Sequence, residues 1–273
     1  MSTHEPVLLA DAAAVDPLGQ GRYRVELAHE YTVFNYPNGG YLQCVMANAA
    51  LAAAVEEGAA HLHATAVATN FISTPVVGPA LVTTHVRRVG RGASFVHVSL
   101  SQDDQVTTES LVTLGMLSET SRARFQMTGP PAMSPRGDCI ALPSYEAMTI
   151  HHSVELRADP AGVQWWKGDV GGGEIQMWMK LSDGGGPWNP WSLLFATDAL
   201  PPATLLLGST GWVPTLQLTS YVRRIPSSEW LRARQWCVVV ADGLVDERCE
   251  LYDDADELVA VSHQLAMVRF GQG

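Results

Sequence analysis

The sequence predicts an α+β fold in which one unit, a helix followed by four antiparallel strands, occurs twice. Three observations support this prediction. An apolar helix-forming segment precedes four strand-like segments, the same order returns about 150 residues later, and the segment between the copies is rich in Pro, Gly, Ser and Met. The copies are expected at residues 1–118 and 148–273, with residues 119–147 as the linker.

The first unit begins with a helix directly after Asn38. Gly39 and Gly40 open the segment GGYLQCVMANAALAAAVEEG, in which Ala and Leu are strong helix formers and apolar positions cover most of the surface. A helix that is apolar on nearly all sides is a buried one. The strands expected after it are at residues 64–74, 80–90, 94–102 and 105–117.

The strands of this unit are expected to form an antiparallel sheet. Residues 94–102, SFVHVSLSQ, alternate strictly between apolar and polar side chains, as a half-buried strand does. The segments on either side are joined to it by the short turns GRGA and QDDQ. Such short connections join antiparallel neighbours, because parallel strands need a long crossover.

The second unit repeats this order. Pro190 and Trp191 open WSLLFATDALPPATLLL, which we predict to be a second long helix, and the expected strands follow at residues 213–223, 229–241, 244–252 and 257–269. Shorter strands are expected before the two helices, at residues 23–28, 32–36, 152–157 and 174–181. A long helix on a curved antiparallel sheet is the hot-dog arrangement, so the chain is predicted to be a double hot-dog with its sheets paired edge to edge. A generic α+β sandwich is the alternative.

Composition excludes several classes of protein. The 273 residues are 47% hydrophobic and 16% charged, with a formal net charge of -11, which disfavours a general nucleic-acid binder. No apolar run approaches the roughly 20 residues of a membrane helix. The N-terminal segment lacks the basic region with which a secretory signal peptide begins. We therefore expect a soluble, cytoplasmic protein without a membrane span. Open sheet edges favour a homodimer or a higher homo-oligomer.

Several motifs of other enzyme classes are absent from the sequence. No GxxxxGK[ST] phosphate loop and no GxSxG nucleophile elbow occurs. The four cysteines, at 44, 139, 237 and 249, form no CxxC pair and no zinc-spaced cluster with histidine, so free thiols are expected. His151 and His152 would point to opposite faces of a strand. We expect no cofactor and no metal.

Asp198 stands out because it lies in an otherwise apolar helical segment. A buried carboxylate without partners costs several kcal/mol. A functional acid, a hydrogen-bonded structural acid and an exposed acid on the solvent face all remain open. The two copies differ at the corresponding positions: Asn48 (198 - 150 = 48) corresponds to Asp198, Thr65 to Thr215, and Leu114 to Gln264. Asp, Thr and Gln therefore occur together only in the second copy.

The chain resembles the acyl-CoA thioesterase II family over nearly its whole length apart from the linker. The segments that carry the likeness are GGYLQCVMANAAL, the turn RVGRGASF, IQMWMKL, ATDALPP and LVAVSHQLAMVR. The family's catalytic set is Asp, Thr and Gln. The resemblance assigns the Asp to Asp198, the Gln to Gln264 and the Thr to Thr215, with Thr219 as the less favoured placement. Leu216-Gln217-Leu218 departs from the family, where an Asp-His pair often follows the Thr.

This resemblance implies an acyl-CoA thioesterase that hydrolyses a fatty or related acyl-CoA by direct attack of water. Asp198 would be the general base, and Thr215 and Gln264 would position the water. Asn38, Gly39, Gly40 and Arg91 are expected to bind substrate, with the glycine amides stabilising the oxyanion. Two alternatives remain: a hot-dog hydratase or dehydratase acting on acyl thioesters, and a non-catalytic acyl-CoA or lipid binder of the same fold.

Overall fold

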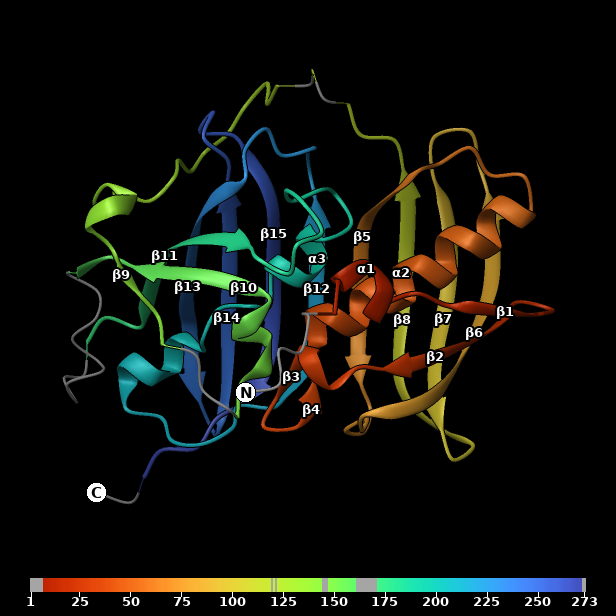
Figure 1. Cartoon of the computed structure of the whole chain (residues 1–273), viewed down its shortest axis with the longest axis horizontal. Helices are drawn as coiled ribbons and strands as arrows, with labels where there is room; N and C mark the ends of the chain where they lie inside the picture. The colour runs from red at the N-terminus through yellow and green to blue at the C-terminus, as the bar shows by residue number, and fades with distance from the viewer. Residues whose placement is uncertain (1–6, 119, 121, 144–146, 161–170, 272–273) are drawn as a thin grey trace.

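The computed structural model describes residues 7–118, 120, 122–143, 147–160 and 171–271. One antiparallel sheet dominates it, with the strand order β1-β2-β6-β7-β8-β5-β12-β15-β14-β13-β11-β10-β9 (Figure 1). The strands are β1 (Asp16–Gly19), β2 (Arg22–Leu27), β5 (His63–Phe71), β6 (Gly78–Val89), β7 (Ser94–Gln102), β8 (Gln105–Gly115), β9 (Ile140–Ala141), β10 (Val154–Ala158), β11 (Glu174–Leu181), β12 (Thr215–Val222), β13 (Trp230–Ala241), β14 (Leu244–Tyr252) and β15 (Leu258–Met267). A separate hairpin pairs β3 (Thr32–Val33) with β4 (Tyr36–Pro37).

These bounds confirm the strands expected from the sequence to within a few residues, except at residues 32–36, and three of them match at both ends: β7, β11 and β14. The one strand expected at residues 32–36 is instead the hairpin of β3 and β4, because Phe34 and Asn35 have positive φ and reverse the chain. The strand expected from residue 152 begins instead at Val154, so His151 and His152 lie in a 3-10 turn, Thr149–His152. The other 3-10 turns among the described residues are His29–Tyr31, Arg136–Asp138 and Ala203–Leu207.

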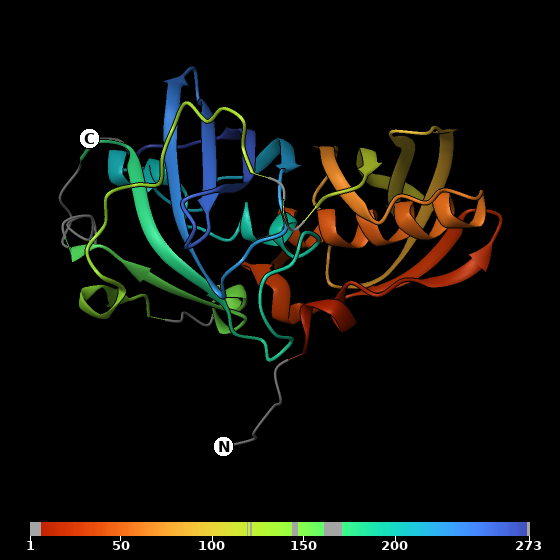
Figure 2. The same cartoon turned by 90° about the horizontal axis from the view of Figure 1, so that it is seen from above.

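The helix α2 (Gly39–Glu56) forms the centre of the first half. Twelve of its residues are buried, as its nearly continuous apolar surface predicts. The sheet curls around it: β5, β8, β7 and β6 lie on one side and β1–β2 on the other (Figure 2). A short helix, α1 (Leu9–Ala12), lies beside α2 (Figure 1). The resulting core lies between α2 and the concave face of the sheet.

The second long helix is not formed, which corrects the sequence-based prediction. Only α3 (Leu193–Ala196) is α-helical, and the chain resumes as the 3-10 turn Ala203–Leu207 after Pro201 and Pro202. Proline has no backbone N–H, and its ring clashes with the preceding helical turn, so a helix cannot continue through the Pro-Pro pair to the segment that follows. The helix that packs on the sheet is therefore 18 residues long in the first half, whereas the second half has only the four residues of α3.

Strands β5 and β12 join the two halves into one sheet. They pair antiparallel from Gln217 opposite Asn70 to Tyr221 opposite Ala66. Gln43 of α2 reinforces the junction, because its side-chain nitrogen donates to the carbonyls of Val67 and Leu218 on the two strands. No helix among the described residues combines the length and apolar character needed to cross a bilayer.

Candidate active site

Asp198 lies just after α3, against the first turn of α2. Its Oδ2 accepts hydrogen bonds from the backbone nitrogen of Gly40 at 2.9 Å and from Nδ2 of Asn38 at 3.0 Å. Asn38 is the N-cap of α2, since its Oδ1 accepts from the backbone nitrogen of Tyr41. The same amide nitrogen of Asn38 also donates to the carbonyl oxygen of Asp198. The helix start of the first half therefore holds the carboxylate of the second.

Glycine at positions 39 and 40 is required by the close approach of α2 to the α3 segment. A Cβ at Gly40 would lie 2.7 Å from the carbonyl oxygen of Leu194 and 2.9 Å from that of Phe195. A Cβ at Gly39 would lie 2.9 Å from Oδ2 of Asp198. Side chains at these positions would push the carboxylate away from the helix N-terminus.

The surroundings of Asp198 set its pKa near neutrality. Burial is the main cause that raises the pKa of this carboxyl, and the negative charge of Glu247 acts in the same direction. Hydrogen bonds from Gly40 and Asn38 lower it, and the net result is a pKa raised from 3.8 to about 7. The side chain keeps some contact with solvent although protein atoms surround it densely. Its second oxygen, Oδ1, takes no part in the hydrogen bonds formed by the described residues, so that oxygen is available to a water molecule.

The two glycine amides expected to stabilise the oxyanion differ in their contacts. The Gly40 N–H donates to Oδ2 of Asp198 at 2.9 Å, so in this arrangement it is engaged with the carboxylate. This donor at the positive end of the helix stabilises the ionised acid. The oxyanion role of Gly39 and Gly40 stays a prediction.

Thr215 and Gln264 meet on the inner face of the sheet. The Thr215 hydroxyl donates to Oε1 of Gln264 at 3.2 Å. An irregularity between Thr215 and Gln217 shifts the register of β12 against β15 and accompanies this contact. Thr219 pairs instead with His263, which is exposed on the opposite face from Gln264. The structure thus joins Thr215, and not Thr219, to Gln264.

Glu247 of β14 completes this group of side chains and was not anticipated. It is 2% exposed, and its Oε2 accepts from Nε2 of Gln264 at 2.6 Å. The sequence does indicate it, because Glu247 alternates with the inward-facing residues Val245 and Cys249 on the same face of β14. An acid among inward-facing apolar residues is unusual, as Asp198 is in its apolar segment, because acids are rarely buried.

Asp198 lies close enough to Glu247 for the charge of Glu247 to raise its pKa, but no hydrogen bond of the described residues links Asp198 to the Thr215–Gln264–Glu247 group. Arg91 lies elsewhere. It is exposed in the β6–β7 turn, whereas Gly39 adjoins Phe71, which lies at the opposite end of the sheet beside the β7–β8 turn. The structure therefore does not bring Arg91 to the other expected site residues.

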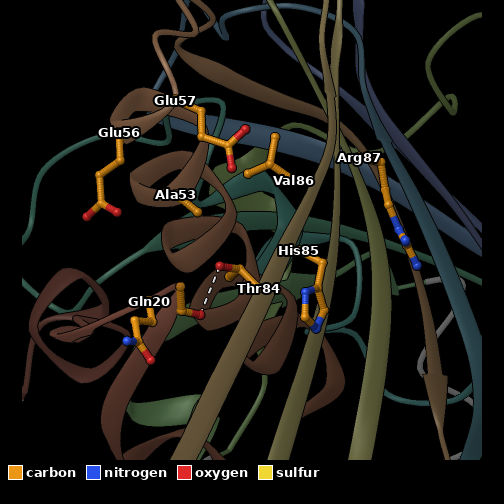
Figure 3. Close-up of a pocket in the computed structure, with 9 residues that line it drawn as sticks. Gln20, Ala53, Glu56, Glu57, Thr84, His85, Val86 and Arg87 are labelled. Carbon is orange, nitrogen blue, oxygen red and sulfur yellow. Dashed lines mark hydrogen bonds between the residues drawn. The ribbon is translucent and has the colours of Figure 1, made fainter.

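Two cavities of the described part lie away from these residues. The larger, of about 330 Å³, lies between the end of α2 and β6 (Figure 3). In it the Thr84 hydroxyl donates to the carbonyl of Gly21, while the Arg87 side chain points away from Glu56 and Glu57. The smaller, of about 280 Å³, lies beside His151 and β10. No group of three His, Cys, Asp or Glu side chains within the described ranges is placed to hold a metal ion.

Two family models match most of the chain. The acyl-CoA thioesterase N-terminal domain matches residues 28–115, and the acyl-CoA thioesterase C-terminal domain matches residues 128–268. An uncharacterised protein of Mycobacterium tuberculosis is 28% identical over 292 residues, which cover 96% of this chain and 98% of that protein.

Solved structures agree with this assignment. A candidate thioesterase II from Thermobifida fusca superimposes with a TM-score of 0.87 at 32% identity, covering 96% of this chain and 97% of that one. A hot-dog protein of unknown function from Alicyclobacillus acidocaldarius gives a TM-score of 0.83 at 19% identity, covering 97% and 98%, and shows that the fold is of the hot-dog type. The chain belongs to the acyl-CoA thioesterase family and is a thioester hydrolase.

Proposed function

We propose that this protein hydrolyses the thioester of a fatty or related acyl-CoA by direct attack of water, with Asp198 as the general base. The observation that supports this most strongly is the environment of Asp198. Its carboxylate is held by the N-terminus of α2, one oxygen remains open, and its pKa is raised to about 7. A base whose pKa lies near the operating pH is well suited to proton transfer.

In the proposed reaction, Oδ1 of Asp198 takes a proton from water as the water oxygen bonds to the thioester carbonyl carbon. The tetrahedral intermediate then collapses, the carbon–sulfur bond breaks, and the leaving thiolate takes the proton from Asp198. The products are a carboxylic acid and free thiol. Thr215 and Gln264 would hold the water, since the hydroxyl of Thr215 donates to Gln264 and keeps its lone pairs for a water proton.

We further propose that the chain is a fused pair of hot-dog units, at residues 1–118 and 148–273, joined by the linker 119–147. The continuous sheet across β5 and β12 supports this. An asparagine before each helix supports it too: Asn38 caps α2, and Asn189 accepts from the backbone nitrogens of Trp191 and Ser192 in the turn that precedes α3. In this arrangement the first unit supplies the helix N-terminus and the second supplies the acid.

A hydratase or dehydratase is not favoured by the described geometry. That chemistry pairs a histidine with an acid, and His263, adjacent to Gln264 in sequence, is exposed on the other face of the sheet. A covalent route through Thr215 is also disfavoured, because its hydroxyl donates to an amide oxygen and not to a base.

We also propose that the protein is a homodimer and lies in the cytoplasm. The sequence-based argument for a dimer was that the sheet has open edges, and the edge strands are short. The edge strands of the sheet, β1 and β9, contain four and two residues. Strands this short offer few unpaired backbone groups. A dimer would therefore use another surface, and light scattering of the purified protein would determine the oligomeric state.

Free-thiol release from a panel of acyl-CoAs tests the proposed activity. We expect turnover for at least one chain length, and a loss of about 10² to 10⁴ in kcat for Asp198→Asn, the usual worth of a general base. Binding of acyl-CoA without thiol release would favour the non-catalytic lipid binder. An undiminished rate in Asp198→Asn would mean that another group is the base.

A further inference from the structure

Glu247 is a deeply buried acid beside the proposed site, with 2% of its surface exposed, and it is surrounded by hydrogen-bond donors. Its Oε2 accepts from the side-chain nitrogens of Gln264 and Gln235, at 2.6 and 3.2 Å. Its Oε1 accepts from the backbone nitrogen of Thr204 at 3.2 Å, and Cys237 Sγ lies 3.7 Å from the same oxygen. Burial raises the pKa of Glu247, while the hydrogen bonds from Gln264 and from the backbone of Thr204 lower it and favour the ionised carboxylate, which can only accept.

The orientation of Gln235 shows independently that Glu247 is an acceptor. The Nε2 of Gln235 also donates to the carbonyl of Pro201 at 3.1 Å. A backbone carbonyl cannot donate, so this contact fixes the Gln235 amide with its NH₂ group toward Glu247. One oxygen of Glu247 is thus committed to accepting from Gln235, and the other accepts from a backbone N–H.

The orientation of Gln264 follows from this arrangement. Its amide must present the NH₂ group to the acceptor Glu247, which turns its Oε1 toward Thr215. The Thr215 hydroxyl must then donate to Gln264. Its two lone pairs remain free, so Thr215 is an acceptor toward a water proton.

We propose that Glu247 is a positioning residue that sets the direction of the hydrogen-bond chain Glu247–Gln264–Thr215 and so orients the attacking water. This inference rests on the proposed hydrolytic function of Asp198, Thr215 and Gln264. Glu247 does not touch the reacting atoms. It lies at the buried end of this hydrogen-bond chain, whereas Gln264 and Thr215 are only half-buried.

The charge of Glu247 also acts on Asp198. The titratable groups that face this region from the packed elements are Asp198 after α3, Cys237 of β13 and Cys249 of β14. Burial raises the pKa of both thiols, so they are uncharged near neutral pH. Glu247 is then the negative group that raises the pKa of Asp198 beyond the effect of burial.

The test compares Glu247→Gln with Glu250→Gln. Glu250 is a buried acid on the same strand, but it accepts from Thr128 and Tyr252 outside the site. In Glu247→Gln one acceptor oxygen becomes an NH₂ group, which meets either the N–H of Thr204 or the NH₂ groups of Gln235 and Gln264. The charged acceptor that fixes Gln264 is lost, so the Gln264 amide can turn over and present its nitrogen to Thr215. We expect kcat for acyl-CoA hydrolysis to fall about 10- to 100-fold, the worth of one hydrogen bond to a charged group, with KM unchanged.

Two readouts separate positioning from a structural role. The acid limb of the pH profile of kcat/KM should move to lower pH in Glu247→Gln, because a like charge near Asp198 is removed, and should stay in place in Glu250→Gln. In a Thr215→Val background, Glu247→Gln should lower kcat little further, because the two residues act through one chain. Additive losses, or an unmoved acid limb, would overturn the inference.

A second variant applies if Glu247→Gln does not fold, as judged by circular dichroism. The exchange Glu247→Gln with Gln264→Glu keeps one carboxylate and one amide, and Glu at 264 can only accept from Thr215. We expect kcat of the exchange variant to be at least 10-fold higher than that of Gln264→Glu alone, the equivalent of one hydrogen bond. Equal rates would contradict the proposal.

The failure of this inference and the failure of the proposed function give different results. Absence of thiol release by the wild-type protein would refute the proposed function itself, whereas an active wild type matched by Glu247→Gln would refute only the role of Glu247.

Discussion

The carboxylate of Asp198 lies 2.9 Å from the backbone nitrogen of Gly40, so the acid of one half is held by the helix N-terminus of the other. Helix α2 begins at Gly39, and its unpaired amides and dipole favour a negative charge at this point. Burial acts in the opposite direction and raises the pKa. The balance of these effects leaves an acid that changes its charge near neutral pH.

The first prediction concerns the pH dependence of the rate. Because the base must be ionised, kcat/KM should rise with pH and level off above an apparent pKa of about 7. A pH series with a short-chain and a long-chain acyl-CoA would measure this limb. A limb near pH 4 would show that another acid, or a fully solvated one, controls the rate.

The second prediction concerns stability. The pKa of Asp198 is raised by folding from 3.8 to about 7, so the protonated acid is favoured in the folded protein. The protonation of Asp198 contributes to the free energy of unfolding in full below pH 3.8. This contribution is lost as the pH rises from 3.8 through about 7, and the loss is roughly 4 kcal/mol at most. Asp198→Asn should therefore raise the free energy of unfolding at pH 8 while removing activity. Denaturation at pH 5 and pH 8 measures it, and a variant less stable than wild type at pH 8 would contradict the sign.

A third prediction compares two threonines on one strand. Thr215→Val leaves Oε1 of Gln264 without its donor, so we expect kcat to fall about 10- to 100-fold with little change in KM. Thr219→Val is the matched control, because Thr219 pairs with His263 on the other face. Steady-state kinetics on the two variants would distinguish the positions, and an equal loss in both would argue against the proposed water site.

The fourth prediction concerns the glycine at the helix start. In Gly40→Ala the new methyl group meets two backbone carbonyls at less than 3.0 Å, so the α3 segment must move and carry Asp198 with it. We expect a loss of stability of about 1–3 kcal/mol and a fall in kcat. Gly92→Ala provides the control, since a Cβ there meets nothing within 4 Å. Thermal melting together with thiol release would measure both effects.

The fifth prediction concerns Arg91. The β6–β7 turn that carries it is separated from the Asp198 end of the sheet by the nine residues of β7. We expect Arg91→Ala to leave KM for acyl-CoA unchanged. A several-fold rise in KM would restore the substrate-binding role that the sequence indicated, with the coenzyme extended along the sheet.

Much of the fold could be predicted because strand signals are local. Alternation along residues 94–102 and short polar turns define β7 and its neighbours within the chain itself. The second helix differs from the prediction for a reason that is also local. The apolar character of residues 191–207 favours one long helix, but a helix cannot continue through Pro201 and Pro202.

The sequence by itself determined most of the strands and their order, and it singled out Asp198 as an acid in an apolar segment, because these depend on spacing and on residue type. Thr215 and Gln264 were indicated by the resemblance to the thioesterase family. Only the tertiary structure decided which groups meet. The pairing of Asp198 with Asn38 and Gly40 spans about 160 positions, and the Glu247–Gln264–Thr215 chain depends on the registers of β12, β14 and β15 and on the irregularity after Thr215. Such contacts are fixed by packing across the sheet, which no local pattern encodes.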